Sequence, residues 1–160
     1  MRIKGIEIED FVNYKDPSLF IASCFCDFKC CKEQNLDLKV CQNSSLHEAE
    51  IKEISNEDIY KYFVSNFITR AVVVGGMEPF LQFKEVYELI HFFRSKKENC
   101  PFVIYTGYYP AEIRSKIETL KEFSNIIIKF GRFVPHKEKK YDPVLGVYLS
   151  SSNQFGVQIC

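Results

Sequence analysis

Apolar and polar residues follow two patterns along the chain, and these patterns predict strands that alternate with helices. Five segments have the apolar character of strands, namely residues 2–9, 18–23, 69–74, 101–106 and 125–130. A helix is predicted between the second and third of these segments, because Ile59, Phe63 and Phe67 lie at helical spacing. Ser55 and Asp58 form the sequence pattern of a capping box and mark the start of this helix.

Two further helices are predicted in the second half of the chain. Apolar residues at helical spacing mark the first of them: Phe83, Val86, Tyr87, Ile90 and Phe93. The other is expected to begin at Pro110, since proline is tolerated at the first helical position. Its inward-facing residues are expected to be Ile113, Ile117 and Leu120. From Arg132 onward we expect irregular structure with one or two short strands around 144–149.

Strands that alternate with helices form mostly parallel sheets whose faces the helices cover. Residues 1–160 are therefore predicted to form a single α/β domain, which is large enough for a hydrophobic core. The chain is too short for a closed eight-stranded barrel, so we expect an open or partial (β/α) barrel. Ligands of such sheets bind beyond the carboxyl ends of the strands. The segments expected there are the loop after residue 23 and the turns at 75–79, 106–108 and 129–132.

The segment from Cys24 to Ile54 has no strong periodic pattern, and a loop of this length in a compact domain usually carries function. The chain has seven cysteines, and five of them fall within eighteen positions of this segment: Cys24, Cys26, Cys30, Cys31 and Cys41. A secreted disulfide scaffold normally spreads its cysteines along the chain. Clustered cysteines in a reducing compartment indicate ligands of a metal or of an iron–sulfur cluster.

The charges narrow the range of partners. Lys+Arg and Asp+Glu are equal at 21 each, so no net charge draws the chain to nucleic acid or to an anionic membrane. No apolar stretch approaches the ~20 residues of a membrane span, and the first residues lack the apolar core of a signal peptide. We therefore expect no nucleic-acid partner, no membrane association and a cytoplasmic location.

The cysteine spacing leaves two kinds of site open. Three residues separate Cys26 from Cys30, and ten separate Cys30 from Cys41. Three cysteines on one loop can ligate three corners of a [4Fe–4S] cube and leave the fourth iron open to a small chelating ligand. Cys24 also lies within reach. Four of the five cysteines could instead hold zinc in a non-catalytic interaction domain, although the Cys30–Cys41 half has no second closely spaced pair.

A strand followed by Cys26-x3-Cys30 and then by Cys41-Gln42-Asn43 resembles the radical S-adenosylmethionine superfamily, and within it the activases of anaerobic ribonucleotide reductase. The resemblance runs from about residue 10 to residue 154 and includes the tail segments at 131–133 and 151–154. It implies that Cys26, Cys30 and Cys41 ligate a [4Fe–4S] cluster.

The chain departs from the usual motif of this superfamily, C-x3-C-x2-C, in three respects. Glu33 stands at the third cysteine position, and eight additional residues precede Cys41. Gln42 replaces an aromatic residue of the activases. Phe130 stands where the activases commonly have aspartate.

Gly75, Gly76 and Glu78 directly follow a predicted strand. Two glycines let the backbone approach a ligand closely, and exposed carbonyls with a carboxylate can receive an ammonium group. An ordinary turn is the alternative interpretation of this sequence. The segment resembles the glycine-glycine-glutamate motif of the superfamily, which implies that Glu78 holds the methionyl amino group of S-adenosylmethionine.

The resemblance assigns further contacts with the cofactor. The residues expected to bind it are Val40, Asn43, Gly75, Gly76, Glu78, Thr106, Lys129 and Asn153. Val40 is expected to pack near the adenine. Lys129 and Arg132 could meet the cofactor carboxylate, or could simply be solvated cations at a strand end. Asn153 and Gln154 could bind the cofactor or cap the tail.

By this resemblance the protein is expected to be a radical S-adenosylmethionine oxidoreductase. The reduced cluster would cleave S-adenosylmethionine to methionine and a 5′-deoxyadenosyl radical, with no catalytic residue beyond cluster and cofactor. The radical would then take hydrogen from a glycine of class III anaerobic ribonucleotide reductase, and flavodoxin or ferredoxin would supply electrons. The alternatives are an activase of another glycyl-radical enzyme, a modifier of another peptide, and the zinc-binding interaction domain.

Overall fold

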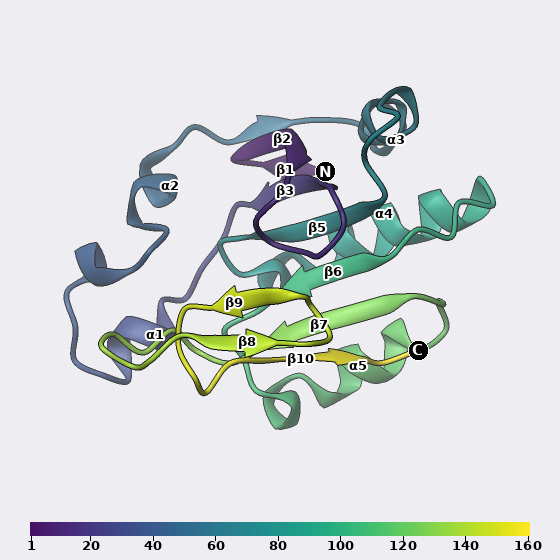
Figure 1. Ribbon diagram of the computed structural model, residues 1–160. Helices are drawn as coiled ribbons and strands as arrows, with labels where there is room; N and C mark the ends of the chain where they lie inside the picture. Colours follow the sequence, from purple (N-terminus) through teal and green to yellow (C-terminus); the bar gives the residue numbers. More distant parts are fainter.

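The computed structural model describes residues 1–160 and contains a six-stranded sheet of mixed orientation (Figure 1). Its strands, in spatial order, are β10 (Phe155–Gln158), β7 (Ile126–Phe130), β6 (Phe102–Tyr105), β5 (Ala71–Gly76), β3 (Ser18–Ser23) and β2 (Gly5–Asp10). The four central strands are parallel, whereas β10 and β2 pair with their neighbours in antiparallel orientation. The two edge strands do not pair with each other, and the partial barrel stays a prediction.

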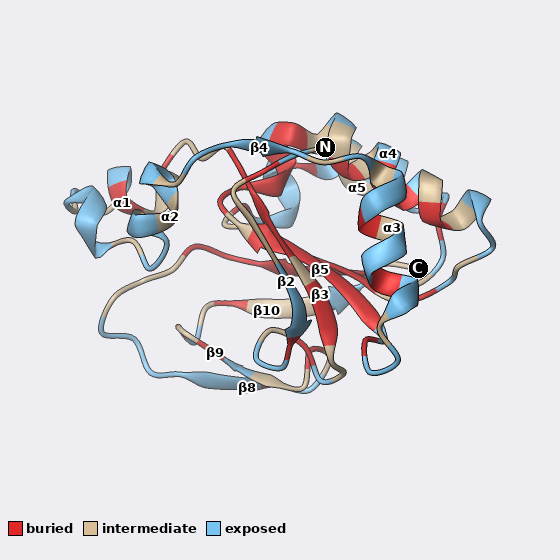
Figure 2. Cartoon of the chain, turned by 90° about the horizontal axis from the view of Figure 1, so that it is seen from above, coloured by how far each residue is buried: buried red, intermediate tan, exposed pale blue.

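Three helices cover one face of the sheet (Figure 2): α3 (Asn56–Ser65), α4 (Phe83–Ser95) and α5 (Arg114–Leu120). The main hydrophobic core of 22 buried residues lies between these helices and the sheet. Val72 and Val74 belong to this core, whereas Val73 belongs to a smaller core on the other face, because successive side chains of a strand point to opposite faces. None of the helices is both long and apolar enough to cross a membrane.

The opposite face is covered by a two-stranded hairpin, β8 (Lys140–Asp142) and β9 (Val147–Leu149). Leu145 and Leu149 of this hairpin belong to the smaller core, together with Val73 of the sheet. The Asp142 carboxylate shapes the hairpin turn, because Oδ1 accepts hydrogen bonds from the backbone N–H groups of Val144 and Leu145 at 3.1 and 2.9 Å. The sheet is therefore covered on both faces, which explains why its central strands are almost entirely apolar.

The segment from residue 24 to residue 54 lies beside the carboxyl ends of the parallel strands (Figure 1). It contains α1 (Lys29–Lys32), the 3-10 turn η1 (Leu38–Val40), α2 (Ser44–Glu48) and β4 (Lys52–Glu53). Strand β4 pairs with β1 (Arg2–Ile3) and so returns the chain to its beginning. Two more 3-10 turns, η2 (Pro79–Gln82) and η3 (Pro110–Glu112), precede α4 and α5.

Most predicted elements are confirmed. Strand β3 has the predicted bounds, and β5, β6 and β7 differ from the predicted strands by one or two residues at their ends. Helix α4 buries Val86, Leu89, Ile90 and Phe93 along one face. Helix α3 starts as predicted, because the Ser55 side chain accepts a hydrogen bond from the Asp58 N–H at 3.0 Å.

Several expectations about these elements are wrong. Phe67 lies beyond α3 and is 89% exposed, because Asn66 ends the helix. The Asn66 side-chain oxygen accepts hydrogen bonds from the backbone N–H groups of Ile68 and Thr69, which turns the chain out of the helix. The chain from Pro110 forms a short 3-10 turn, so α5 begins later than predicted, whereas Ile113, Ile117 and Leu120 all pack into or against the core as expected.

The structure also adds elements that the sequence patterns did not predict. The segment 24–54 is not featureless, since it holds two short helices, a 3-10 turn and a strand. The tail contributes β10, which pairs with β7 at the edge of the main sheet. Its sequence, FGVQ, has a glycine and only two large apolar residues, which is too little for a pattern.

Candidate functional site

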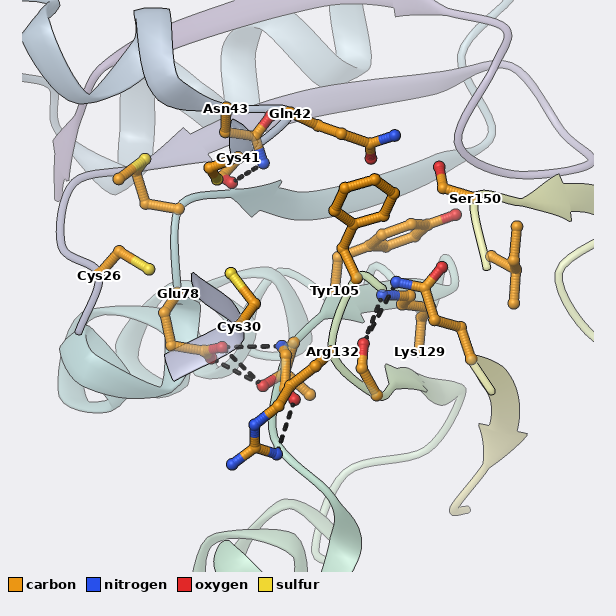
Figure 3. A pocket seen from close by; sticks show the side chains of 18 of the residues that line it. Cys26, Cys30, Cys41, Gln42, Asn43, Glu78, Tyr105, Lys129, Arg132 and Ser150 are labelled. Atoms are coloured by element: carbon orange, nitrogen blue, oxygen red, sulfur yellow. Dashed lines mark hydrogen bonds between the residues drawn. The ribbon is translucent and has the colours of Figure 1, made fainter. Parts of the chain in front are cut away.

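A cavity of about 250 Å³ opens at the carboxyl ends of β5, β6 and β7, beside the cysteine loop (residues 24–43) (Figure 3). Most of the predicted site residues line it: Cys26, Cys30, Cys41, Asn43, Gly76, Glu78, Thr106 and Lys129. Val40, Gly75 and Asn153 do not line it. Because the four central strands are parallel, the loops that follow them meet at this edge of the sheet, as predicted.

The three proposed ligand cysteines lie on separate turns of the cysteine loop. Cys26 directly precedes a tight turn, and its Sγ accepts a hydrogen bond from the Phe28 N–H at 3.3 Å. Phe28 has a left-handed backbone (φ 56°) and starts α1, the helical turn that carries Cys30. Cys41 directly follows η1. All three side chains are partly buried, and all three line the cavity.

The other four cysteines do not line the cavity. Cys24 is buried near Arg2 and Glu85, and burial raises the pKa of its thiol. Cys31 is the buried residue of α1, with its Sγ 3.9 Å from that of Cys30. Cys100 belongs to the main core, and Cys160 lies against the backbone of α5 and the turn after it. The cavity thus separates Cys26, Cys30 and Cys41 from the rest, although Cys31 stays next to Cys30.

Cys30 and Cys41 interact through their thiols. A hydrogen bond from the Cys30 thiol lowers the pKa of Cys41 to about 6, and the same contact raises the pKa of Cys30. Thiolate is the form of cysteine that binds iron, so Cys41 is prepared for this role. No three His, Cys, Asp or Glu side chains surround a common point at the distances of a single metal ion. A cube of four irons instead distributes its thiolates over separate corners, and the donor set fits such a cluster.

The two glycines at the end of β5 meet the cysteine loop directly. The Asn43 side-chain amide donates a hydrogen bond to the Gly76 carbonyl, and the Ser23 hydroxyl donates one to the Gly75 carbonyl at 2.8 Å. Gly76 has φ +76°, and a Cβ at this position would lie 2.7 Å from Leu46 Cδ2. Only glycine suits both the backbone angle and this close approach. Gly75 and Asn43 therefore have protein partners at the groups that were expected to meet the cofactor.

Glu78 is a nearly buried carboxylate at the cavity wall, with an exposed fraction of 5%. Thr106 Oγ1 donates to its two oxygens at 2.8 and 2.9 Å, and the Gly107 N–H donates to Oε2 at 2.9 Å. The Phe80 N–H donates to Oε1 at 3.1 Å. Burial nevertheless raises the pKa of Glu78 to about 7, because these donors only partly replace water. Thr106, predicted as a cofactor contact, holds Glu78 in place.

Lys129 is a nearly buried cation on the same cavity, with an exposed fraction of 7%. Its Nζ donates one hydrogen bond, to the Gly131 carbonyl at 3.1 Å, although an ammonium group has three donors. Burial lowers the pKa of Lys129 to about 8. Neither Lys129 nor Glu78 takes part in an ion pair.

Arg132 differs from Lys129 in having carboxylate partners of its own. Its guanidinium forms ion pairs with Glu112 at 2.7 Å and with Glu33 at 2.6 Å. Of the two cations considered for the cofactor carboxylate, only Lys129 is therefore free. The sequence did not indicate Glu33 and Glu112 as partners of Arg132, since 99 and 20 positions separate them from it.

The tail segment at 151–154 closes over the end of β7. The Asn153 side chain donates a hydrogen bond to the Arg132 carbonyl at 2.8 Å, and the Gln154 side chain donates one to the Gly131 carbonyl at 3.2 Å. Gly131 has φ +99°, and a Cβ there would lie 3.0 Å from the Asn153 carbonyl. In this structure Asn153 secures the tail, which was one of its two predicted roles.

The structure adds site residues that sequence patterns missed. The Tyr108 hydroxyl donates to Asp27 Oδ2 at 2.7 Å and so joins the end of β6 to the cysteine loop. Phe20, Tyr105 and Tyr148 bring aromatic surface to the cavity. Tyr148 lies on β9, which reaches the cavity only because the hairpin folds back over the sheet, and nothing in its local sequence indicates this.

A comparison with known families is consistent with this geometry. Residues 17–155 match the model of a family described as a 4Fe–4S single cluster domain. No curated protein and no solved structure matches the chain. The matched residues include β3, all three proposed ligand cysteines and the strand ends that form the cavity. The chain belongs to this family of 4Fe–4S single cluster domains and is an iron–sulfur protein.

Proposed function

We propose that the chain is a radical S-adenosylmethionine enzyme in which Cys26, Cys30 and Cys41 hold the [4Fe–4S] cluster. The observation that carries this proposal is that two buried ionisable side chains on the cavity wall, Glu78 and Lys129, take part in no ion pair. A cavity that presents a carboxylate and an ammonium group suits a zwitterionic ligand. The methionyl group of S-adenosylmethionine is such a ligand, with an amino group and a carboxylate on the same carbon.

Burial makes these two charges informative. Each costs free energy when it is removed from water without an ion-pair partner, and burial shifts the pKa of both groups. Perturbed ionisable groups that line a cavity are typical of functional sites. A bound zwitterion would bring an opposite charge into direct contact with each group, which no ion pair of the chain does, so the cavity would gain more from this ligand than from a singly charged one.

Cys26, Cys30 and Cys41 would hold the cluster, which in its reduced state would supply the electron for reductive cleavage of the carbon–sulfur bond of the sulfonium. The residues of the chain bind, orient and shield. Glu78 receives the amino group, Lys129 receives the carboxylate, and Phe20 and Tyr105 limit access of water to the reactive carbon. The hydrogen bonds from Thr106 and Gly107 hold the Glu78 carboxylate in one orientation.

We propose a glycine of anaerobic class III ribonucleotide reductase as the substrate, with flavodoxin or ferredoxin as electron donor. Family membership supports the cluster. The resemblance of the cysteine loop and of the tail to the activases supports the choice of partner. The small size of the domain is consistent with a protein substrate, since the partner itself can complete the shielding of the radical. The sheet would then act as an open or partial barrel whose mouth receives the glycine loop.

Binding tests the first half of the proposal. The protein is reconstituted with iron and sulfide without oxygen, and its affinity for S-adenosylmethionine is measured by calorimetry. Glu78→Gln should keep its iron and bind about tenfold or more weakly, because a charge-assisted hydrogen bond contributes on the order of 1.5–3 kcal/mol. Glu88→Gln, on the exposed side of α4, is the matched control and should bind as the unchanged protein does. Equal affinity of the Glu78 variant would contradict the assignment.

A spectroscopic experiment tests the second half. Reduced protein, S-adenosylmethionine and the reductase are mixed without oxygen, and the electron paramagnetic resonance spectrum is recorded. A doublet that disappears when the reductase glycine is changed to alanine supports the proposal. A radical on a different glycyl-radical protein would assign the alternative partner. A colourless protein with one zinc and no iron would show that the proposed chemistry is wrong.

A further inference from the structure

We propose that Arg132 is a positioning residue whose ion pairs clamp the helical turn that carries Cys30 onto the strand ends. The clamp consists of Arg132, Glu112, Glu33 and Lys29. The proposal rests on the proposed function in one respect, because it takes Cys30 as a ligand of the cluster. The clamp residues themselves touch neither cluster nor cofactor in this proposal.

At the strand ends, the clamp consists of the ion pair between Arg132 and Glu112, whose geometry is favourable. Arg132 directly follows β7 and Gly131, and its side chain is only 7% exposed. Its Nη1 and Nη2 each donate to one oxygen of the Glu112 carboxylate at 2.7 Å, which is the bidentate arrangement of a guanidinium with a carboxylate. The guanidinium also lies 5.1 Å from the centre of the Tyr109 ring.

The other half of the clamp grips α1 on both sides of Cys30. Lys29 immediately precedes Cys30, and its Nζ lies 3.0 Å from Glu112 Oε1. Glu33 is the last residue of this turn, and its Oε1 accepts a hydrogen bond from Arg132 Nη2 at 2.8 Å. Both flanks of Cys30 are therefore joined to the same ion pair, of which the Arg132 side is buried.

Helix α1 cannot hold its position without such contacts. It has four residues, and an isolated helix of this length is not stable in water. It starts at a left-handed residue, Phe28, and has no side-chain cap at that end. The place of Cys30 therefore depends on tertiary contacts. The clamp supplies two of them, and removal of Glu112 would break both the bidentate pair with the buried guanidinium and the pair with Lys29, leaving Glu33 as the one carboxylate on Arg132.

The clamp also bears on the choice of the third ligand. Glu33 stands at the position that holds the third cysteine in the usual superfamily motif. Its carboxylate is engaged by Arg132 at 2.6 and 2.8 Å, so the ion pair withholds it from iron. Arg132 thus positions Cys30 and at the same time leaves the third corner of the cluster to Cys41.

The first test uses the protein without its cluster, so that it does not depend on loading. Hydrogen exchange of the peptide that covers residues 26–41 is followed by mass spectrometry. Arg132→Gln and Glu112→Gln should each exchange about tenfold faster than the unchanged protein, since each breaks charge-assisted hydrogen bonds. Arg132→Lys should be intermediate, because it keeps the charge and loses the fork. Glu118→Gln, which breaks the exposed pair with Lys121 on α5, is the control and should show no change.

The second test follows iron after anaerobic reconstitution. The clamp variants should begin with the same iron content and release it to a ferrous chelator about tenfold faster. The double variant Arg132→Gln/Glu112→Gln should release iron more slowly than the two single effects multiplied together, since both changes break the same Arg132–Glu112 pair. If a variant at a more buried clamp position does not fold, Glu33→Gln, at a half-exposed position, replaces it in the iron-release test.

The outcomes separate this proposal from the proposed function. Exchange and iron release that are unchanged in all clamp variants would overturn the clamp. Unchanged protein that never loads a cluster, or a Cys30→Ala variant that keeps a full one, would contradict the proposed ligand set. The exchange measurement on the cluster-free protein would still decide whether the clamp holds α1.

Discussion

The strand ends and the cysteine loop face each other across one cavity, but they are held in place by different interactions. The ends of β5, β6 and β7 continue a hydrogen-bonded sheet whose side chains are packed on both faces. The cysteine loop has only short helical turns and is joined to the strand ends mainly by side chains. These contacts include the Tyr108–Asp27 hydrogen bond, the Asn43–Gly76 hydrogen bond and the clamp, and the Glu78 N–H adds a backbone hydrogen bond to the Phe25 carbonyl at 2.7 Å.

This difference indicates which part of the site is the more stable and which part depends on it. Buried strands are the most stable parts of a fold, whereas segments with few buried apolar contacts open at little cost. Glu78 and Lys129 lie on the stable part, so the fold of the sheet already places these two ionisable side chains on the cavity wall. The thiols lie on the other part, and their final arrangement depends on the cluster that they bind.

The largest expected effect is the loss of iron when a ligand cysteine of the loop is replaced, while the sheet stays folded. Cys26→Ala, Cys30→Ala and Cys41→Ala should each lose most of the iron after anaerobic reconstitution, because each removes one of three protein ligands. The fold should persist by circular dichroism, since the sheet does not depend on the loop.

The controls for this experiment are the neighbouring cysteines that do not line the cavity. Cys24→Ala and Cys31→Ala should keep about four irons per chain. Loss of iron from Cys24→Ala, or full retention in Cys41→Ala, would show that the ligand set is different.

The pH dependence of the free energy of unfolding tests whether the buried Glu78 carboxyl has a raised pKa. Burial raises the pKa of Glu78 from its ordinary 4.5 to about 7, so the folded protein keeps a proton that the unfolded chain has lost. Stability of the cluster-free protein should therefore fall as the pH rises from 4.5 to 7, by up to about 3 kcal/mol from this group. Glu78→Gln should remove this slope, as measured by urea unfolding at several pH values, whereas Glu88→Gln should retain it.

The lowered pKa of Lys129 should make the free energy of unfolding change with pH in the opposite direction, at higher pH. Burial lowers its pKa from 10.5 to about 8, so the unfolded chain holds a proton that the folded protein has lost between these values. Stability should rise as the pH increases from 8 to 10.5. Lys129→Met should abolish this rise, and a variant with an unchanged rise would place the buried cation elsewhere.

A substitution at the contact between the two regions should have a smaller effect. Gly76→Ala forces an alanine to φ +76° and brings its Cβ within 2.7 Å of Leu46 on the loop. We expect a loss of about 1–3 kcal/mol in the free energy of unfolding. Gly5→Ala is the control, because a Cβ at Gly5 meets nothing within 4 Å. Equal midpoints of urea unfolding for the two variants would mean that the loop moves to accommodate the added Cβ without loss of stability.

The smallest effect is expected from the hydrogen bond between Tyr108 and Asp27. Tyr108→Phe removes one donor to the loop carboxylate and should cost about 1 kcal/mol of stability. It should also speed hydrogen exchange near residue 27 more than near residue 104. Tyr148→Phe, at an exposed position on β9, should change neither quantity.

The comparison also explains which predictions from the sequence succeeded. Segments 18–23 and 125–130 are short apolar runs and helix α4 has apolar residues at helical spacing, and the structure confirms these elements because their packing depends on these patterns. The gathering of strand-end turns at one edge followed from the alternation of strands and helices. Phe67 was assigned to α3 wrongly, because the Asn66 side chain ends the helix through a local contact that apolar spacing does not reveal.

The sequence by itself determined the parallel core, the edge of the sheet at which the cavity lies, and the cysteine-rich segment of a chain that belongs to a family of 4Fe–4S single cluster domains. These features follow from patterns among neighbouring residues. Only the tertiary structure decided that Arg132 is occupied by Glu33 and Glu112 while Lys129 is free, and that Asn43 binds the Gly76 carbonyl. Such pairings join residues far apart in the chain, so local patterns carry no information about which charges find a partner.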